Sequence, residues 1–175
     1  MDWKIVKGRE EQVKEIAALY ARTIDALVEG VNYTGWQRGG YPGEGTAREG
    51  VAAGTLYVAQ KEGVIGGTVI LNHLYEGAYE KGEWAVDCPY SEVFCVHTLV
   101  VDPACRGQGI ASALLDFAAA EGLRAGMRAL RLDVFEENAP AIALYEKKGF
   151  ERRTRVDLGL GIPGLKWFYL CEKLL

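Results

Sequence analysis

The sequence has few of the residues that build metal centres and disulfide frameworks. Among 175 residues there are two histidines and four cysteines, and no two cysteines have the Cys-x-x-Cys spacing. Zinc sites need several such ligands at short, regular spacings, so neither a zinc site nor any other metal cofactor is expected. Dispersed cysteines without an evident partner are typical of a reducing compartment, which predicts a cytoplasmic protein.

Long hydrophobic runs and excess positive charge are also lacking. No apolar stretch reaches the eighteen or more residues that a membrane span requires, and the first residues do not form a signal peptide. The net charge is −4, whereas nucleic-acid binders usually carry a basic face. We therefore expect neither a membrane nor a nucleic-acid partner, and the negative charge is compatible with a cationic amine as substrate.

The length suits one domain with one hydrophobic core. Hydrophobic residues make up 49% of the chain and charged residues 25%, which is the composition of an ordinary globular protein. No linker or internal repeat interrupts the pattern. A single domain over residues 1–175 is therefore expected, and its oligomeric state, including a homodimer, is left open.

Apolar periodicity predicts a mixed α/β chain with the element order β-α-α-β-β-β-α-β-α-β-β. Thr46 is expected to cap the second helix. The near-continuous apolar run of residues 93–101 predicts a central strand that is buried on both faces. Residues 72–91 form a polar and aromatic insertion that is long enough to suggest a functional role. Strands are expected at residues 3–7, 56–60, 64–71, 93–101, 129–135, 152–158 and 165–172, and helices at 9–29, 47–53, from 110 onward and 140–148.

The most informative segment is Val100–Ala111. A β-branched run ends at Asp102-Pro103, and two glycines, Gly107 and Gly109, then precede a helix. A glycine lets the backbone approach a ligand closely, and the N-terminus of a helix favours an anion such as pyrophosphate. The segment therefore predicts a phosphate-binding loop.

Two familiar nucleotide loops do not fit this segment. A P-loop needs a lysine directly after its last glycine, and none is present. The dinucleotide fingerprint needs a third small residue at a fixed offset and lies at the first strand–helix turn of its domain. Here Ser112 follows, the loop lies past mid-chain, and the preceding strands have the pattern of a hairpin.

The pattern Arg106-x-x-Gly109-x-Ala111 resembles motif A of the GNAT superfamily of N-acetyltransferases, and Asn138–Phe150 resembles its motif B. The resemblance implies the GNAT fold, a central mixed, mostly antiparallel sheet of about seven strands flanked by about four helices. It also implies acetyl-CoA as cosubstrate. The expected reaction is direct transfer of the acetyl group, in a ternary complex, to the primary amine of a small molecule or peptide.

The same resemblance assigns residues to the cosubstrate. Backbone N–H groups of the loop would surround the pyrophosphate, with the guanidinium of Arg106 beside it. The main chain of residues 99–101 would pair with the pantetheine arm where two central strands diverge. Asn138, which also reads as a helix N-cap, would contact the same arm. The expected cofactor-binding residues are Leu99, Val100, Val101, Arg106, Gly107, Gln108, Gly109, Ile110, Ala111, Ser112, Asn138 and Tyr145.

Three residues are candidates for proton transfer. Tyr145 matches the motif B tyrosine and would protonate the departing thiolate, although it also lies on a helix face with core residues. Glu92, at the start of the central strand, and His97, within it, are alternative bases for the amine. Asp133 on the next strand would orient His97 or bind the acceptor, and a purely surface role for it is equally compatible with the sequence.

The acceptor pocket would be walled by the loop after the first helix. Trp36, Gln37 and Tyr33, together with Tyr41, are the candidates there, with the insertion from Tyr75 to Trp84 opposite, although aromatic residues can equally serve packing. The alternative function is a non-catalytic acyl-CoA-binding or sensing module, and transfer of a longer acyl group is a third possibility. Polyamine, aminoglycoside, amino acid and protein N-terminus all stay open as acceptors.

Overall fold

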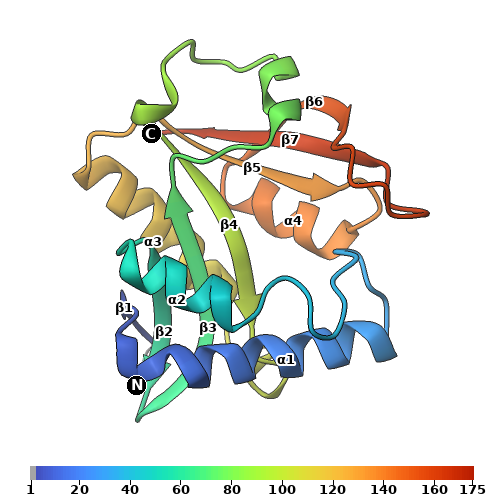
Figure 1. The fold of residues 1–175 in the computed structure, drawn as a ribbon. Helices are drawn as coiled ribbons and strands as arrows, with labels where there is room; N and C mark the ends of the chain where they lie inside the picture. The colour runs from blue at the N-terminus through green and yellow to red at the C-terminus, as the bar shows by residue number, and fades with distance from the viewer. Residues whose placement is uncertain (1–2) are drawn as a thin grey trace. The chain divides into compact units, whose positions relative to one another are not determined.

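The computed structural model describes residues 3–175 (Figure 1). Strands and helices follow the predicted order. The strands are β1 (Lys4–Lys7), β2 (Leu56–Lys61), β3 (Val64–Asn72), β4 (Val93–Val101), β5 (Ala129–Phe135), β6 (Glu151–Asp157) and β7 (Trp167–Leu174). The α-helices are α1 (Val13–Glu29), α2 (Glu44–Ala52), α3 (Ile110–Arg124) and α4 (Ala139–Lys147).

The strands form a seven-stranded sheet in the order β1-β2-β3-β4-β5-β7-β6. The pairs β1–β2, β2–β3, β5–β7 and β6–β7 are antiparallel, whereas β4 and β5 run parallel. The predicted mixed, mostly antiparallel sheet is therefore confirmed. The register between β4 and β5 joins Val93–Cys95 to Ala129–Arg131, although β4 has nine residues and β5 has seven.

The chain divides into two compact units. Among the described residues, the first unit comprises residues 3–32, 36–71 and 97–117, and the second comprises residues 33–35, 72–96 and 118–175. Both β4 and α3 run through the two units, so neither unit contains these elements whole. The expectation of one domain over residues 1–175 stays a prediction.

The core of the first unit is built on the inner face of α1. Apolar residues recur there at helical spacing, so one stripe of the helix is buried. Leu19 belongs to this stripe, whereas Val28 near the end of the helix is exposed. The cluster comprises Val13, Ile16, Leu19, Tyr20, Ala47, Leu56, Val58, Ile65, Ile70 and Val100.

The second unit has its own buried cluster. It gathers side chains from the insertion after β3, from the first half of β4 and from β5, β6 and β7. Its buried members are Tyr79, Val93, Cys95, Ala129, Val156 and Leu170. The insertion thus contributes directly to a hydrophobic core.

Two local predictions were wrong. Helix α2 begins at Glu44, with Gly43 in the N-cap position, so Thr46 is not the cap; its Oγ1 instead accepts a hydrogen bond from the Gly43 N–H at 3.1 Å. Strand β4 is not buried on both faces. From His97 to Val101 half-buried and buried residues alternate, because successive side chains point to opposite faces of a sheet.

Candidate functional site

The loop after β4 is shaped by Asp102. Its carboxylate accepts a hydrogen bond from the Ala104 N–H at 2.9 Å and so caps a short 3₁₀ turn at Pro103–Cys105. Gly107 and Gly109 then adopt φ values of +77° and +76°, which L-residues with a side chain rarely adopt. No atom lies within 4 Å of the position that a Cβ would occupy at either glycine. The loop is therefore tightly turned and open to solvent.

The start of α3 leaves backbone donors available. Within residues 3–175, the N–H groups of residues 107–112 have no hydrogen-bond acceptor, as expected for the first turn of a helix. Arg106 is exposed, and its guanidinium has no ion-pair partner in the same part of the chain. Helix α3 is fifteen residues long, so its dipole adds to these donors. The predicted loop residues thus form a site suited to a phosphate group.

An ion pair that supports this loop was not anticipated from the sequence. The nearly buried carboxylate of Asp102 accepts hydrogen bonds from Arg22 on α1 at 2.6 and 3.0 Å. Asp102 had been noted only as the end of a strand. No local pattern could have identified Arg22, because it lies 80 residues earlier in the chain.

Three other residues expected to contact the cosubstrate lie on strand β4. Leu99 and Val101 are half-buried, and Val100 between them is buried. His97 is also half-buried and shares the alternation of Leu99 and Val101, as predicted. Thr98 differs from its neighbours, because its φ of +48° lies in the left-handed region.

The two candidate bases occupy different surroundings. Glu92 ends a 3₁₀ turn directly before β4, and its half-exposed carboxylate lies 3.6 Å from the guanidinium of Arg128. At about 3.3 Å per residue, Glu92 is roughly 16 Å along the strand from His97. At this separation, the two residues cannot both contact the same reacting atom directly.

Asn138 and Tyr145 lie on α4. The side chain of Asn138 accepts a hydrogen bond from the Ala141 N–H at 3.2 Å, which confirms it as the N-cap. The half-buried ring of Tyr145 contacts Phe150 edge-on, at 5.8 Å between centroids. No partner for the Tyr145 hydroxyl is found in residues 3–175. Burial raises the pKa of Tyr145 well above its ordinary value, with smaller contributions from Asp133 and Cys171.

Asp133 interacts with the insertion. Its carboxylate accepts a hydrogen bond of 2.6 Å from the hydroxyl of Tyr79. Tyr79 is fully buried, and burial followed by the nearby carboxylate raises its pKa well above the ordinary value. This contact gives Asp133 a partner that the sequence did not predict.

The aromatic acceptor candidates are divided between the units. Trp36 is half-buried, packs against the core cluster of the first unit and meets Tyr41 edge-on at 6.0 Å. Gln37 in the same unit is exposed. Tyr33 is half-buried and belongs to the second unit. Trp36 thus has the packing role that the sequence left open.

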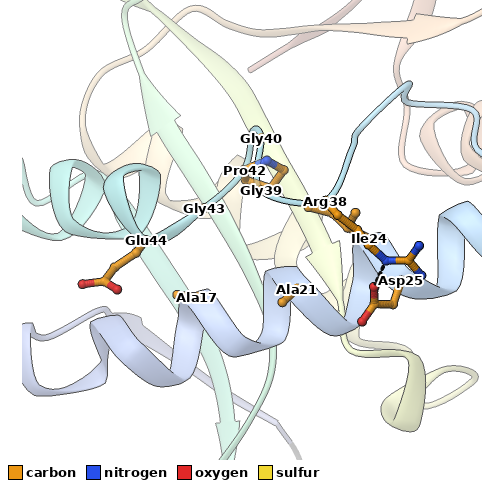
Figure 2. Close-up of a pocket in the computed structure, with 10 residues that line it drawn as sticks. All are labelled: Ala17, Ala21, Ile24, Asp25, Arg38, Gly39, Gly40, Pro42, Gly43 and Glu44. Atoms are coloured by element: carbon orange, nitrogen blue, oxygen red, sulfur yellow. Dashed lines mark hydrogen bonds and ion pairs between the residues drawn. The ribbon is translucent and has the colours of Figure 1, made fainter.

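A pocket of about 420 Å³ lies in the first unit (Figure 2). Its floor is the α1 face formed by Ala17, Ala21 and Ile24. Its wall includes Gly39, Gly40, Pro42 and Gly43 of the glycine-rich loop, residues 30–43 between α1 and α2. Figure 2 shows Asp25 and Arg38 at one end, joined by an ion pair of 2.5 Å. The sequence had placed an acceptor pocket along this loop, but not with these lining residues.

The insertion after β3 is anchored by a buried ion pair. Arg131 on β5 and Glu172 on β7 are 3.0 Å apart, and both are at most 2% exposed. Arg131 also donates to the carbonyl of Val86 at 2.8 Å, and its guanidinium lies 4.2 Å from the ring centre of Trp84. Glu172 accepts from the Ala85 N–H at 2.7 Å. The insertion is therefore a fixed part of the second unit.

The sequence model described as the acetyltransferase (GNAT) family matches residues 26–150, well over half of the chain. The chain belongs to this family. Among curated relatives, an uncharacterized N-acetyltransferase of Methanocaldococcus jannaschii is 37% identical over 73 residues, 42% of this chain and 32% of that protein. Mycothiol acetyltransferase of Geodermatophilus obscurus is 42% identical over 59 residues, 34% of this chain and 19% of that protein. The matches thus span less than a third of these relatives' lengths.

Two solved structures share the fold over nearly the whole chain. Ribosomal-protein-alanine N-acetyltransferase from Brucella melitensis has a TM-score of 0.74 at 18% identity, covering 98% of this chain and 99% of that one. The yncA protein of Salmonella typhimurium, solved with its cofactor acetyl-CoA, has a TM-score of 0.73 at 16% identity, covering 100% and 95%. At these identities the likeness establishes the GNAT fold alone.

Within residues 3–175, no three or more histidine, cysteine, aspartate or glutamate side chains come together as metal ligands would. Across the same residues, no helix has both the length and the apolar character needed to cross a bilayer.

Proposed function

We propose that the protein is an acetyl-CoA-dependent N-acetyltransferase acting on a primary amine of a small molecule or peptide. In the direct reaction the amine nitrogen forms a bond to the acetyl carbon, the carbon–sulfur bond breaks, and one proton passes from the amine to the thiolate. The observation that carries this proposal is the set of backbone N–H groups at residues 107–112, which have no acceptor in residues 3–175. Helix-terminal donors of this kind suit the pyrophosphate of acetyl-CoA.

Strand β4 would hold the pantetheine arm. Because β4 pairs with β5 through Val93–Cys95, the later main chain of Leu99–Val101 is the part proposed to pair with the arm. An N–H there would also polarise the thioester carbonyl, and such oxyanion stabilisation is commonly worth ~3 kcal/mol. The side-chain oxygen of Asn138 caps α4, which leaves its NH₂ group as the proposed donor to the same arm.

Tyr145 is the proposed general acid. Its hydroxyl has no partner in residues 3–175, which leaves it open to the departing thiolate. Burial raises its pKa, so the phenol is protonated when the thiolate forms but is a weaker donor than an exposed tyrosine. Of the two candidate bases we favour His97. The carboxylate of Glu92 lies directly before the first residue of β4, where it is 3.6 Å from the guanidinium of Arg128.

The acceptor is proposed to bind along the glycine-rich loop. Gln37 and Tyr33 are still proposed to contact the acceptor, and Asp133 is still proposed to orient its amine. Trp36, which packs against the core, is proposed to form part of the wall of the acceptor site. The pocket adds the polar pair Asp25 and Arg38 to the candidate contacts.

A thiol-release assay tests the proposal. Acetyl-CoA is supplied with a panel containing a polyamine, an aminoglycoside, an amino acid and a peptide with a free N-terminus. We expect amine-dependent release of the CoA thiol with at least one class, together with the acetylated amine by mass spectrometry. A reaction without amine corrects for hydrolysis. Calorimetric binding of acetyl-CoA without thiol release for any amine would instead support the non-catalytic acyl-CoA-binding module.

A further inference from the structure

Thr98 has a backbone conformation that its side chain disfavours. Its φ of +48° lies in the left-handed region, although threonine is branched at Cβ and the residue is in the middle of β4. A non-glycine residue there is strained and persists only where its surroundings hold it. Thr98 is only 7% exposed, so those surroundings are protein side chains.

Two side chains of the first unit hold Thr98. The hydroxyl of Tyr41 forms a hydrogen bond with the Thr98 hydroxyl, and Thr68 Oγ1 donates to the Thr98 carbonyl in a long hydrogen bond of 3.5 Å. Thr68 is fully buried on the neighbouring strand β3. Tyr41 is 53% exposed and comes from the glycine-rich loop, so its contact is the one open to change.

The position of Tyr41 connects two parts of the proposed site. Its neighbours Gly40 and Pro42 line the pocket beside α1 (Figure 2). Its partner Thr98 directly precedes Leu99–Val101, whose main chain is proposed to pair with the pantetheine arm. A change in the loop would therefore reach Thr98 on β4 through the hydrogen bond between the two hydroxyls.

We propose that Tyr41 is a positioning residue. Its hydroxyl stabilises the left-handed conformation of Thr98 and so sets the direction in which β4 presents Leu99–Val101 to acetyl-CoA. The expected effect of Tyr41 on acetyl-CoA binding rests on the proposed function. The effect on Thr98 itself follows from the hydrogen bond alone.

Tyr41→Phe removes the hydroxyl and keeps the ring that meets Trp36. The ¹³Cα and ¹³Cβ chemical shifts of Thr98 report its backbone conformation, and in this variant we expect them to move toward extended-strand values. The dissociation constant for acetyl-CoA, measured by calorimetry, should rise about tenfold. Tyr169→Phe, which removes a tyrosine hydroxyl on β7, should leave the Thr98 shifts unchanged.

Rescue distinguishes positioning from a general structural role. Glycine adopts positive φ without a side-chain penalty, so it does not need the Tyr41 hydroxyl. Adding Thr98→Gly to Tyr41→Phe should therefore restore acetyl-CoA affinity to within about threefold of the parent. Unchanged Thr98 shifts in Tyr41→Phe, or failure of this rescue, would overturn the proposal. If the parent itself did not bind acetyl-CoA, the proposed function would fail, while the Thr98 shifts would still decide the role of Tyr41.

Discussion

Asp102 Oδ2 accepts hydrogen bonds from both Nε and one terminal nitrogen of Arg22, at 3.0 and 2.6 Å. The other carboxylate oxygen accepts from the Ala104 N–H, so both oxygens have partners. The carboxylate is 7% exposed and the guanidinium 51%. This single side chain ties the strand end, the 3₁₀ turn and α1 together just before the proposed phosphate loop.

Replacing Arg22 with alanine should lower the free energy of unfolding by about 1–3 kcal/mol, because a nearly buried carboxylate would lose its cation. Arg48→Ala is the matched control, since Arg48 pairs with Glu10 and Glu44 at the surface, where ion pairs add little. The midpoint of urea unfolding measures both. Equal losses in the two variants would contradict the importance of the Asp102 pair.

Gly109→Glu should weaken acetyl-CoA binding by at least about tenfold, because it places a negative charge where the pyrophosphate is proposed to bind. Gly126→Glu is a close control. Gly126 lies just beyond the other end of α3, with a φ of +75° and nothing within 4 Å of its Cβ position. Both substitutions place glutamate at a positive φ and so carry the same backbone strain. A difference in acetyl-CoA affinity between them, measured by calorimetry, therefore reports the effect of the position. Loss of binding in both, or in neither, would refute the assignment.

Tyr145→Phe should reduce kcat roughly 10²-fold with little change in acetyl-CoA affinity, as expected when a general acid is removed. Because its pKa is raised, the phenol keeps its proton until the pH exceeds about 10, the ordinary tyrosine value. The parent kcat should therefore show no descending limb from this group below that pH. An unchanged kcat, with chemistry shown to be rate-limiting, would assign Tyr145 to packing or to cofactor contact.

The pH dependence of kcat/KM separates the two candidate bases. The rate should rise with pH through a value set by the base and the free amine together. His97→Ala should remove the limb near neutrality, whereas Glu92→Gln should retain it. The reverse pattern would identify Glu92 acting through water. If both variants kept the parent profile, neither residue would be the base.

Calorimetric unfolding tests the single-domain prediction. Since β4 and α3 each run through both compact units, losing one unit removes part of two elements from the other. We expect one cooperative transition whose calorimetric and van't Hoff enthalpies agree. Two resolved transitions would show that the units unfold separately.

Local chemistry explains what the sequence predicted well. Asn138 before Ala-Pro marks a helix start, and Gly107 and Gly109 mark the turn before α3, because caps and glycines act on neighbouring backbone. The Thr46 cap was misplaced by the same local reasoning, since a threonine can also occupy the third position of the first turn and accept from the N-cap.

Contacts between distant residues could not be predicted in this way. Arg22 and Asp102 are 80 residues apart, and Tyr41 and Thr98 are 57 apart. The left-handed φ of Thr98 contradicts its own β-propensity, so only its partners account for it. Side-chain pairing across the fold thus supplies the parts of the candidate site that periodicity and motifs do not reveal.

The buried ion pair of Arg131 and Glu172 also restricts how these two positions can change during evolution. Either charge alone would be left uncompensated in the interior, which is strongly destabilising, whereas exchanging both for apolar residues can be neutral. Replacement one residue at a time must therefore pass through a poorly folded intermediate. Homologues that retain the insertion should keep both residues or neither, and the exposed surface of the insertion can diverge while this pair remains.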